Sequence, residues 1–95
     1  MSPELCRRWI HVREEDRGGV RVFRPAGRPL PPARGRDGLE FRPDGTFVEL
    51  RPGPVDALVT GPPRPWSLRG SRLELADAPH DVVELSDDVL RLRPR

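Results

Sequence analysis

The sequence contains no Lys, Asn, Gln or Tyr, and its 95 residues include a single cysteine, Cys6. One cysteine excludes an internal disulfide and so removes the commonest sign of a secreted small domain. No apolar run is long enough to span a bilayer, and none has the character of a signal-peptide core. These absences predict a soluble, cytoplasmic protein without a membrane partner.

Positive charge occurs only as arginine. All seventeen basic residues are Arg, yet fifteen Asp and Glu are interspersed with them and the formal net charge is only +2. A nucleic-acid-binding surface usually gathers its positive charge on one face. The mixed pattern therefore predicts no nucleic-acid partner. Codon usage in a G+C-rich genome is the simplest source of the arginine preference.

Proline and glycine are abundant, and long helix-forming runs are absent. Thirteen Pro and nine Gly interrupt every long segment, which leaves room for short strands rather than helices. A chain of this length makes one domain, residues 1–95, with a thin core. Its bulkiest members are expected to be Trp9, Phe23, Phe41, Phe47 and Trp66.

Three stretches of the second half alternate apolar and polar residues on either side of a short polar turn. They cover residues 39–48, 66–75 and 82–92. Strand side chains change face at every residue, and tight turns favour residues that tolerate positive φ, so each stretch predicts a β-hairpin. A looser hairpin is expected at residues 8–24, around a charged turn at 14–19.

The pattern predicts eight strands. They are residues 8–13, 20–24, 39–42, 46–50 and 65–69, followed by strands that carry Leu73 with Leu75, Val83 with Leu85, and Leu90 with Leu92 on their inward faces. Eight antiparallel strands can close on themselves and so remove exposed edges. We therefore predict an all-β fold, in which an antiparallel up-and-down meander closes into a small eight-stranded barrel.

Alternation also assigns faces to individual residues. Trp9, His11 and Arg13 share one face of the first strand. Continuing the inward set from Val20 and Val22 places Arg24 inward. The apolar residues expected to point outward are Phe23, Val82 and Val89.

Two proline-rich stretches separate the hairpins. Residues 25–38 contain four Pro and three Gly, which deny them a helix or a central strand. Long connections in compact domains are often binding loops, so we expect residues 25–38 to lie across one end of the barrel. The second stretch, 51–63, includes a piece at 56–60 that is either extended or helical.

Several segments resemble a known family. Leu5-Cys-Arg-Arg-Trp9, Phe41-Arg-Pro-Asp-Gly-Thr-Phe47 and residues 66–75 resemble the bacterial lipocalin-like (calycin-type) small proteins, and residues 83–92 are similar to their last hairpin. Arg7 stands where that family usually has Gly, and the terminal helix of true lipocalins is absent. The resemblance implies a lipocalin-like barrel with a small ligand at its mouth.

One cluster suggests acid–base chemistry. A neutral imidazole oriented by a carboxylate can act as a general base, and His11 is closely followed by Glu14, Glu15 and Asp16. The alternative is that these acids simply face water, because they lie in a predicted turn. A metal site needs three or four converging ligands, and with His80 in another loop none is predicted.

Arginines flank the 25–38 loop. An inward Arg24 must be paired, because an unpaired buried charge is strongly unfavourable. Its partner is an acid at positions 15–16, Asp37, or the carboxylate or phosphate of a ligand, which a guanidinium binds through two parallel hydrogen bonds. The candidate ligand-binding set also takes in two tryptophans that are expected in the core. Its members are Arg24, Arg34, Arg36, Trp9 and Trp66.

Three functions fit these patterns. The first is a non-catalytic binding protein that takes a small apolar or weakly anionic molecule at the barrel mouth, without a cofactor. The second is a protein-interaction module or homodimer with a filled core. The third is a small isomerase or cyclase in which His11 with Glu14 or Glu15 transfers protons and Arg24 binds substrate. A cavity inside the barrel favours the first and third over the second.

Overall fold

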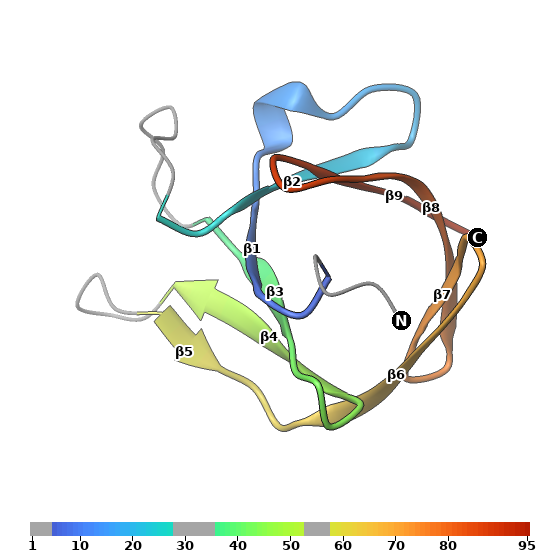
Figure 1. Ribbon diagram of the computed structural model, residues 1–95. Coiled ribbons are helices and arrows are strands. Elements are labelled where there is room, and N and C mark those ends of the chain that lie inside the picture. The colour runs from blue at the N-terminus through green and yellow to red at the C-terminus, as the bar shows by residue number, and fades with distance from the viewer. Residues whose placement is uncertain (1–4, 28–35, 53–57) are drawn as a thin grey trace.

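The computed structural model describes residues 5–27, 36–52 and 58–95, which are almost entirely strand and connecting turns (Figure 1). One short 3-10 helix, η1 (Arg13–Glu15), follows the first strand. The strands are β1 (Arg8–His11), β2 (Arg21–Pro25), β3 (Gly38–Phe41), β4 (Thr46–Pro52), β5 (Leu58–Thr60), β6 (Arg64–Arg69), β7 (Arg72–Leu75), β8 (Ala78–Leu85) and β9 (Leu90–Pro94).

Eight of these strands form the closed antiparallel barrel that the sequence predicts. Around the ring the order is β3-β1-β2-β9-β8-β7-β6-β4, and the pairing of β3 with β4 closes it (Figure 1). β5 adds a short strand beside the last residues of β4, from Leu50 to Pro52. The piece at 56–60 that the sequence leaves open is therefore extended from Leu58 to Thr60.

The strand order differs from a simple up-and-down meander at the first hairpin. β1 pairs antiparallel with both β2 and β3, so β2 and β3, which are joined by the segment 26–37, run in the same direction. The described ends of this segment lie beside the two ends of β1. The Ala26 amide donates to the Arg8 carbonyl (3.0 Å), and the His11 amide donates to the Asp37 carbonyl (2.8 Å). Of the stretch predicted to cover one barrel end, residues 25–38, the middle part 28–35 lies outside the described residues, while Pro25 ends β2 and Gly38 begins β3.

The barrel interior holds the predicted aromatic core. Trp9, Phe41 and Phe47 are almost completely buried, and Trp66 packs against them with its ring edge-on to Phe41 at 5.6 Å between centroids. Tight turns join β3 to β4 and β6 to β7, the strands that carry Phe41, Phe47 and Trp66. Gly45 (φ 90°) and Gly70 (φ 58°) both adopt positive φ in turns that the sequence predicts.

The faces of β2 are the reverse of the prediction. Phe23 is 5% exposed and belongs to the barrel core, so Arg24, its neighbour on the strand, points outward rather than inward. Val22 is also buried, although it lies on the face opposite Phe23. Because β2 buries apolar residues on both faces, the spacing of its valines could not identify the inner one.

A β-bulge exchanges the predicted faces of Val82 and Val83 in β8, whereas Leu85 points inward as predicted. The pairing of β8 with β9 shifts register between Val82 and Glu84. A bulge adds one residue to its strand, so Val82 and Leu85 both pack against the core while Val83 is 49% exposed. The predictions that Val83 points inward and Val82 outward are therefore wrong. Val89, also predicted outward, is buried with 4% exposed.

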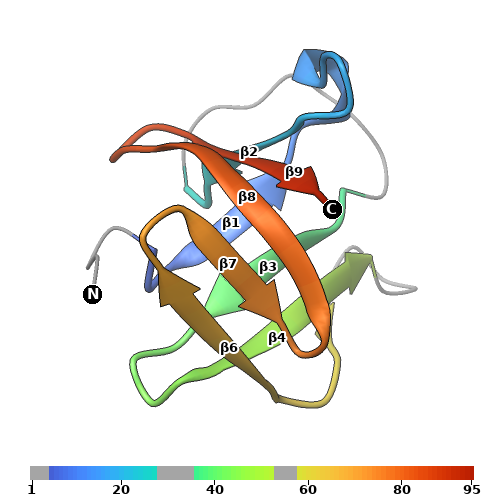
Figure 2. The ribbon, with the colours of Figure 1, turned by 90° about the vertical axis from the view of Figure 1, so that its right-hand side faces the viewer.

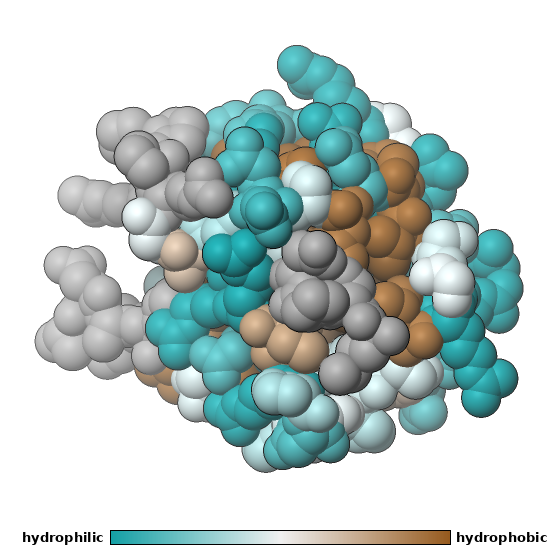
Figure 3. All heavy atoms as spheres, viewed as in Figure 1, coloured by the Kyte–Doolittle hydropathy of each residue, from teal (hydrophilic) through white to brown (hydrophobic). Residues whose placement is uncertain are grey.

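The two ends of the barrel differ. The chain enters at the N-terminal end, where Leu5 is fully buried and its carbonyl accepts a hydrogen bond from Trp9 Nε1 (3.1 Å). The Arg7 guanidinium lies over the Trp9 ring, 5.5 Å from its centroid. Figure 3 looks onto this end and shows apolar atoms framed by hydrophilic side chains. The opposite end, where β1 and β4 finish, is called the cavity end below (Figure 2).

Candidate ligand-binding cavity

A cavity of about 760 Å³ opens at the cavity end of the barrel. It is formed where β1, β4 and β7 end and where β2, β3, β6 and β8 begin. Ligand pockets usually enclose roughly 300–1,000 Å³. The cavity is therefore large enough for a small organic molecule, and the barrel interior is not filled along its whole length.

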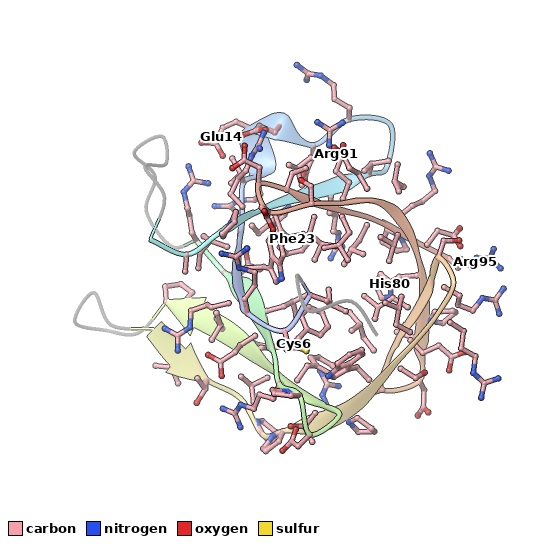
Figure 4. All side chains as sticks on the ribbon, in the orientation of Figure 1. Cys6, Glu14, Phe23, His80, Arg91 and Arg95 are labelled. Carbon is pink, nitrogen blue, oxygen red and sulfur yellow. The ribbon has the colours of Figure 1, made fainter. Side chains whose placement is uncertain are left out.

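The deeper part of the cavity is apolar. Phe23 is one of its apolar lining residues, and Figure 4 shows it on the inner side of the ring of strands. His80, a polar lining residue, also lies on the inner side. An apolar ligand that packs against this inner wall would remove apolar surface of the wall and of the ligand from water, which favours binding. The apolar side chains of this wall also belong to the barrel core or pack against it; they are Phe23, Leu39, Phe47, Leu75 and Leu92.

Two arginines that line the mouth, Arg13 and Arg21, form no ion pair among the described residues. Arg13 follows Val12, whose amide donates to the Val22 carbonyl (2.8 Å), and Arg21 directly precedes Val22. The two therefore leave neighbouring positions of the first hairpin, and both line the cavity. Within residues 5–27, 36–52 and 58–95, neither guanidinium makes a hydrogen bond or an ion pair.

Elsewhere on the rim, Glu49 lies between two other arginines. Its Oε2 accepts a hydrogen bond from Arg51 Nη2 (2.9 Å), and its Oε1 pairs with Arg64. The Arg64 guanidinium also lies over the Phe47 ring, 5.2 Å from the centroid. The lining contains four arginines against two acids, so with both histidines neutral it carries a formal charge of +2.

His11 is held in the cavity wall between two carboxylates. Its Nε2 is 2.9 Å from Asp16 Oδ2, its Nδ1 is 3.4 Å from Asp37 Oδ1, and its side chain is 11% exposed. The ring packs against Phe23 with 5.0 Å between centroids. Asp16 is fixed in turn by the Val22 amide, which donates to Oδ1 (2.8 Å). Among the acids that the sequence places near His11, Asp16 is the one in contact with the imidazole.

Glu14 and Glu15, the predicted acid–base partners of His11, form other ion pairs. Glu14 accepts two hydrogen bonds from Arg36 (2.9 and 2.6 Å), and Glu15 accepts one from Arg24 (2.6 Å). The Arg36 hydrogen bonds lower the pKa of Glu14 from 4.5 to about 2, and they raise the pKa of Arg36. The Glu15 hydrogen bond likewise raises the pKa of Arg24. Both glutamates are therefore held by arginines rather than by His11.

Four of the five residues that the sequence nominates for ligand binding are described, and none of these four lines the cavity. Arg24 and Arg36 are occupied in the ion pairs with Glu15 and Glu14. Trp9 and Trp66 lie in the core, where each indole N–H donates to a backbone carbonyl. Arg34 lies outside the described residues. Of the residues predicted to carry chemistry, His11 is the one that the structure brings to the cavity.

Arg13 and Arg21 are the rim residues that sequence reasoning missed. Alternation along the first strand does place Arg13 on the face of Trp9 and His11, which is the inner face. Arg21 shares its face with Phe23, so the wrong orientation of that phenylalanine also conceals the arginine. Once Phe23 is placed on the inner face of β2, the alternation rule places Arg21 on that face as well.

Three comparisons complete the description of the site. Searches of the chain against protein-family models, curated proteins and solved structures found no match. In the part of the chain that the structure describes, no group of His, Cys, Asp and Glu side chains is arranged to hold a metal ion. No helix there is long and apolar enough to cross a membrane. The cavity is therefore the feature from which a function is argued.

Proposed function

We propose that the protein is a non-catalytic binding protein that takes a small apolar or weakly anionic molecule at the mouth of its barrel. The observation that supports this is the cavity of about 760 Å³, which combines an apolar inner wall with a rim of formal charge +2. The alternative of an interaction module with a filled core expects no such space. The resemblance of the sequence to lipocalin-like proteins, which implies a small ligand at the barrel mouth, agrees with this proposal.

The apolar wall sets the scale of the affinity. A ligand with two fused aromatic rings that buries about 200 Å² gains at most about 5 kcal/mol, at about 25 cal/mol per Å². That corresponds to a Kd of roughly 0.1–1 mM before any polar contact is counted. Hydrogen bonds to charged groups add about 1.5–3 kcal/mol each, so micromolar binding needs the rim.

The neutral fluorescent probe N-phenyl-1-naphthylamine tests the proposal. We expect a saturable rise of its fluorescence on titration with the protein, and displacement of the probe by members of a panel of fatty acids, retinoids and aromatic acids. Bound members of the panel should also raise the thermal unfolding temperature, because a ligand that binds only the folded state stabilises it.

Two tryptophan substitutions locate the site. Ala78 is exposed and lines the cavity, so Ala78→Trp should fill the space and abolish probe binding without opening a hole in the core. Ser71→Trp places the same bulk in the exposed turn between β6 and β7, at the other end of the barrel, and should bind as the unmodified protein does. Equal binding by the two variants, or no binding by any of the proteins, would refute the proposal.

A further inference from the structure

We infer that the ligand carries one carboxylate-type anionic group, which is bound between the guanidinium groups of Arg13 and Arg21 while its apolar body lies against the inner wall. This inference rests on the proposed function and names the class of molecule that the cavity accepts. It depends on three observations of the rim: the position of the two arginines, the occupation of the other arginines, and the balance of charged and apolar lining.

Arg13 and Arg21 bring two positive charges to the rim; the charge of Arg13 helps to lower the pKa of Glu14, but that carboxylate is hydrogen-bonded to Arg36. Arg13 and Arg21 leave neighbouring positions of the first hairpin and both line the same cavity. Arg13 begins η1 and Arg21 begins β2, and two positive charges at the same end of one hairpin repel each other. A carboxylate between the two guanidiniums would turn this repulsion into two attractions, and each planar fork can donate two parallel hydrogen bonds to such a group.

The other two arginines that line the cavity already have a carboxylate, and so does Arg36 at the same end. Arg51 and Arg64 share Glu49, and Arg36 is bound by Glu14. Glu49 in particular occupies the site between its two arginines that an anionic ligand would otherwise fill. Arg13 and Arg21 are distinguished from these arginines because neither forms an ion pair among the described residues.

A second pair of adjacent arginines provides a comparison within the molecule. Arg69 and Arg72 are direct partners in the pairing of β6 with β7, at the N-terminal end of the barrel. Neither lines the cavity, and Arg72 lies opposite Asp81 on β8. There the like charges are exposed to water, with an acid one strand away. The Arg13–Arg21 pair instead adjoins an apolar wall, where an amphipathic anion can meet both surfaces.

The rest of the lining limits the anion to a single, singly charged group. The acids Asp37 and Glu49 also face the cavity and would repel additional negative charge. The inner wall is apolar, so a strongly charged body would lose hydration without compensating contacts. A carboxylate on an aromatic or aliphatic body satisfies both conditions, whereas a phosphate monoester or an oligonucleotide does not.

A matched acid and alcohol test the inference. Bound N-phenyl-1-naphthylamine is displaced by 2-naphthylacetate or by 2-naphthylethanol, which differ in the charged group. We expect the acid to compete about tenfold more strongly than the alcohol at low salt, since a charge-assisted hydrogen bond contributes on that order. The preference should weaken as the ionic strength is raised, because both arginines are exposed and therefore screened.

Two double variants separate the site from general charge. In R13Q/R21Q the preference for the acid should disappear while binding of the neutral probe is unchanged. R69Q/R72Q removes the same charge from the other end of the barrel and should keep the preference. If the probe binds but the acid and the alcohol compete equally, or if R13Q/R21Q retains the preference, the inference is wrong and the binding function stands. If the probe does not bind, both fail together.

Discussion

The two ends of the barrel are built differently. At the N-terminal end, apolar packing and backbone hydrogen bonds dominate: Leu5 is fully buried, and the indole N–H groups of Trp9 and Trp66 donate to main-chain carbonyls. At the cavity end, charged side chains surround an open space, Glu49 is held in ion pairs with two arginines, and His11 lies between two carboxylates. The first arrangement stabilises a fold, whereas the second leaves room and charge for another molecule.

We expect the N-terminal end of the barrel to contribute mainly to stability and the cavity end mainly to ligand binding. Apolar side chains removed from water contribute most of the folding free energy, while exposed ion pairs contribute little. Substitutions at the N-terminal end should therefore act mainly on stability. Substitutions on the cavity rim should act mainly on binding and on the response to pH and salt.

The largest effect is expected at Gly38, which lines the cavity but touches the backbone of Trp9. A Cβ built on Gly38 would lie 2.1 Å from the Trp9 carbonyl oxygen. Backbone cannot move aside as a side chain can, so Gly38→Ala must separate β1 from β3 and should lower the free energy of unfolding by about 4 kcal/mol. Chemical denaturation measures this loss.

Gly61→Ala is the matched control. A Cβ at Gly61 meets its nearest neighbour, the Glu49 carbonyl oxygen, at an ordinary contact distance of 3.8 Å. We expect a change in the free energy of unfolding of less than about 1 kcal/mol. Equal stability of the Gly38→Ala and Gly61→Ala proteins would show that β1 and β3 do not approach as closely as described. Gly38 would then not be a cavity-lining position that controls stability.

A leucine at each end gives the next largest effect. Leu5→Ala removes a fully buried side chain at the N-terminal end and should cost about 3 kcal/mol of unfolding free energy, because the surrounding core cannot collapse completely. Leu39→Ala truncates a half-buried residue that already borders the cavity, and should cost about 1 kcal/mol. The same substitution should weaken binding of N-phenyl-1-naphthylamine, which Leu5→Ala should leave intact. A reversed order of stabilities would contradict the division between the two ends.

Local pattern was sufficient to predict the strands and tight turns of this protein. Alternation identified the hairpin strands, and Gly45 and Gly70 adopt the positive φ that their turns require. It failed for β2 and β8, where Val22 is buried on the face opposite Phe23 and a bulge isolates Val83. Both features depend on what packs against the strand from elsewhere in the chain, and no local period contains that information.

The site was less predictable than the fold for a related reason. Pairing of β2 with β9 joins segments from opposite halves of the chain, and the cavity is the space that the assembled strands leave unfilled. His11 was identified because a histidine near acids is conspicuous in any sequence. Arg13 and Arg21 were not, because seventeen arginines give none of them prominence until the fold shows which lack an acidic partner.

The smallest effect concerns the ion pair of Glu14 and Arg36 at the cavity end. Its hydrogen bonds lower the pKa of Glu14 from 4.5 to about 2. A pKa depressed by folding adds stability that is complete above the ordinary value and disappears as the pH falls through the folded-state value. Glu14→Gln should therefore lower the thermal unfolding temperature above pH 4.5, by less than either core substitution, because Glu14 is exposed.

The pH dependence of that variant distinguishes the ion pair from a general loss of charge. The difference in unfolding temperature between the unmodified protein and Glu14→Gln should be constant above pH 4.5 and close as the pH falls towards 2. Glu74→Gln is the control, since Glu74 is an exposed strand carboxylate without an ion pair among the described residues, and its difference should stay near zero throughout. A Glu14→Gln difference that persists at pH 2 would mean that Glu14 stabilises the cavity end through packing rather than charge. Packing would then stabilise the cavity end as it stabilises the N-terminal end.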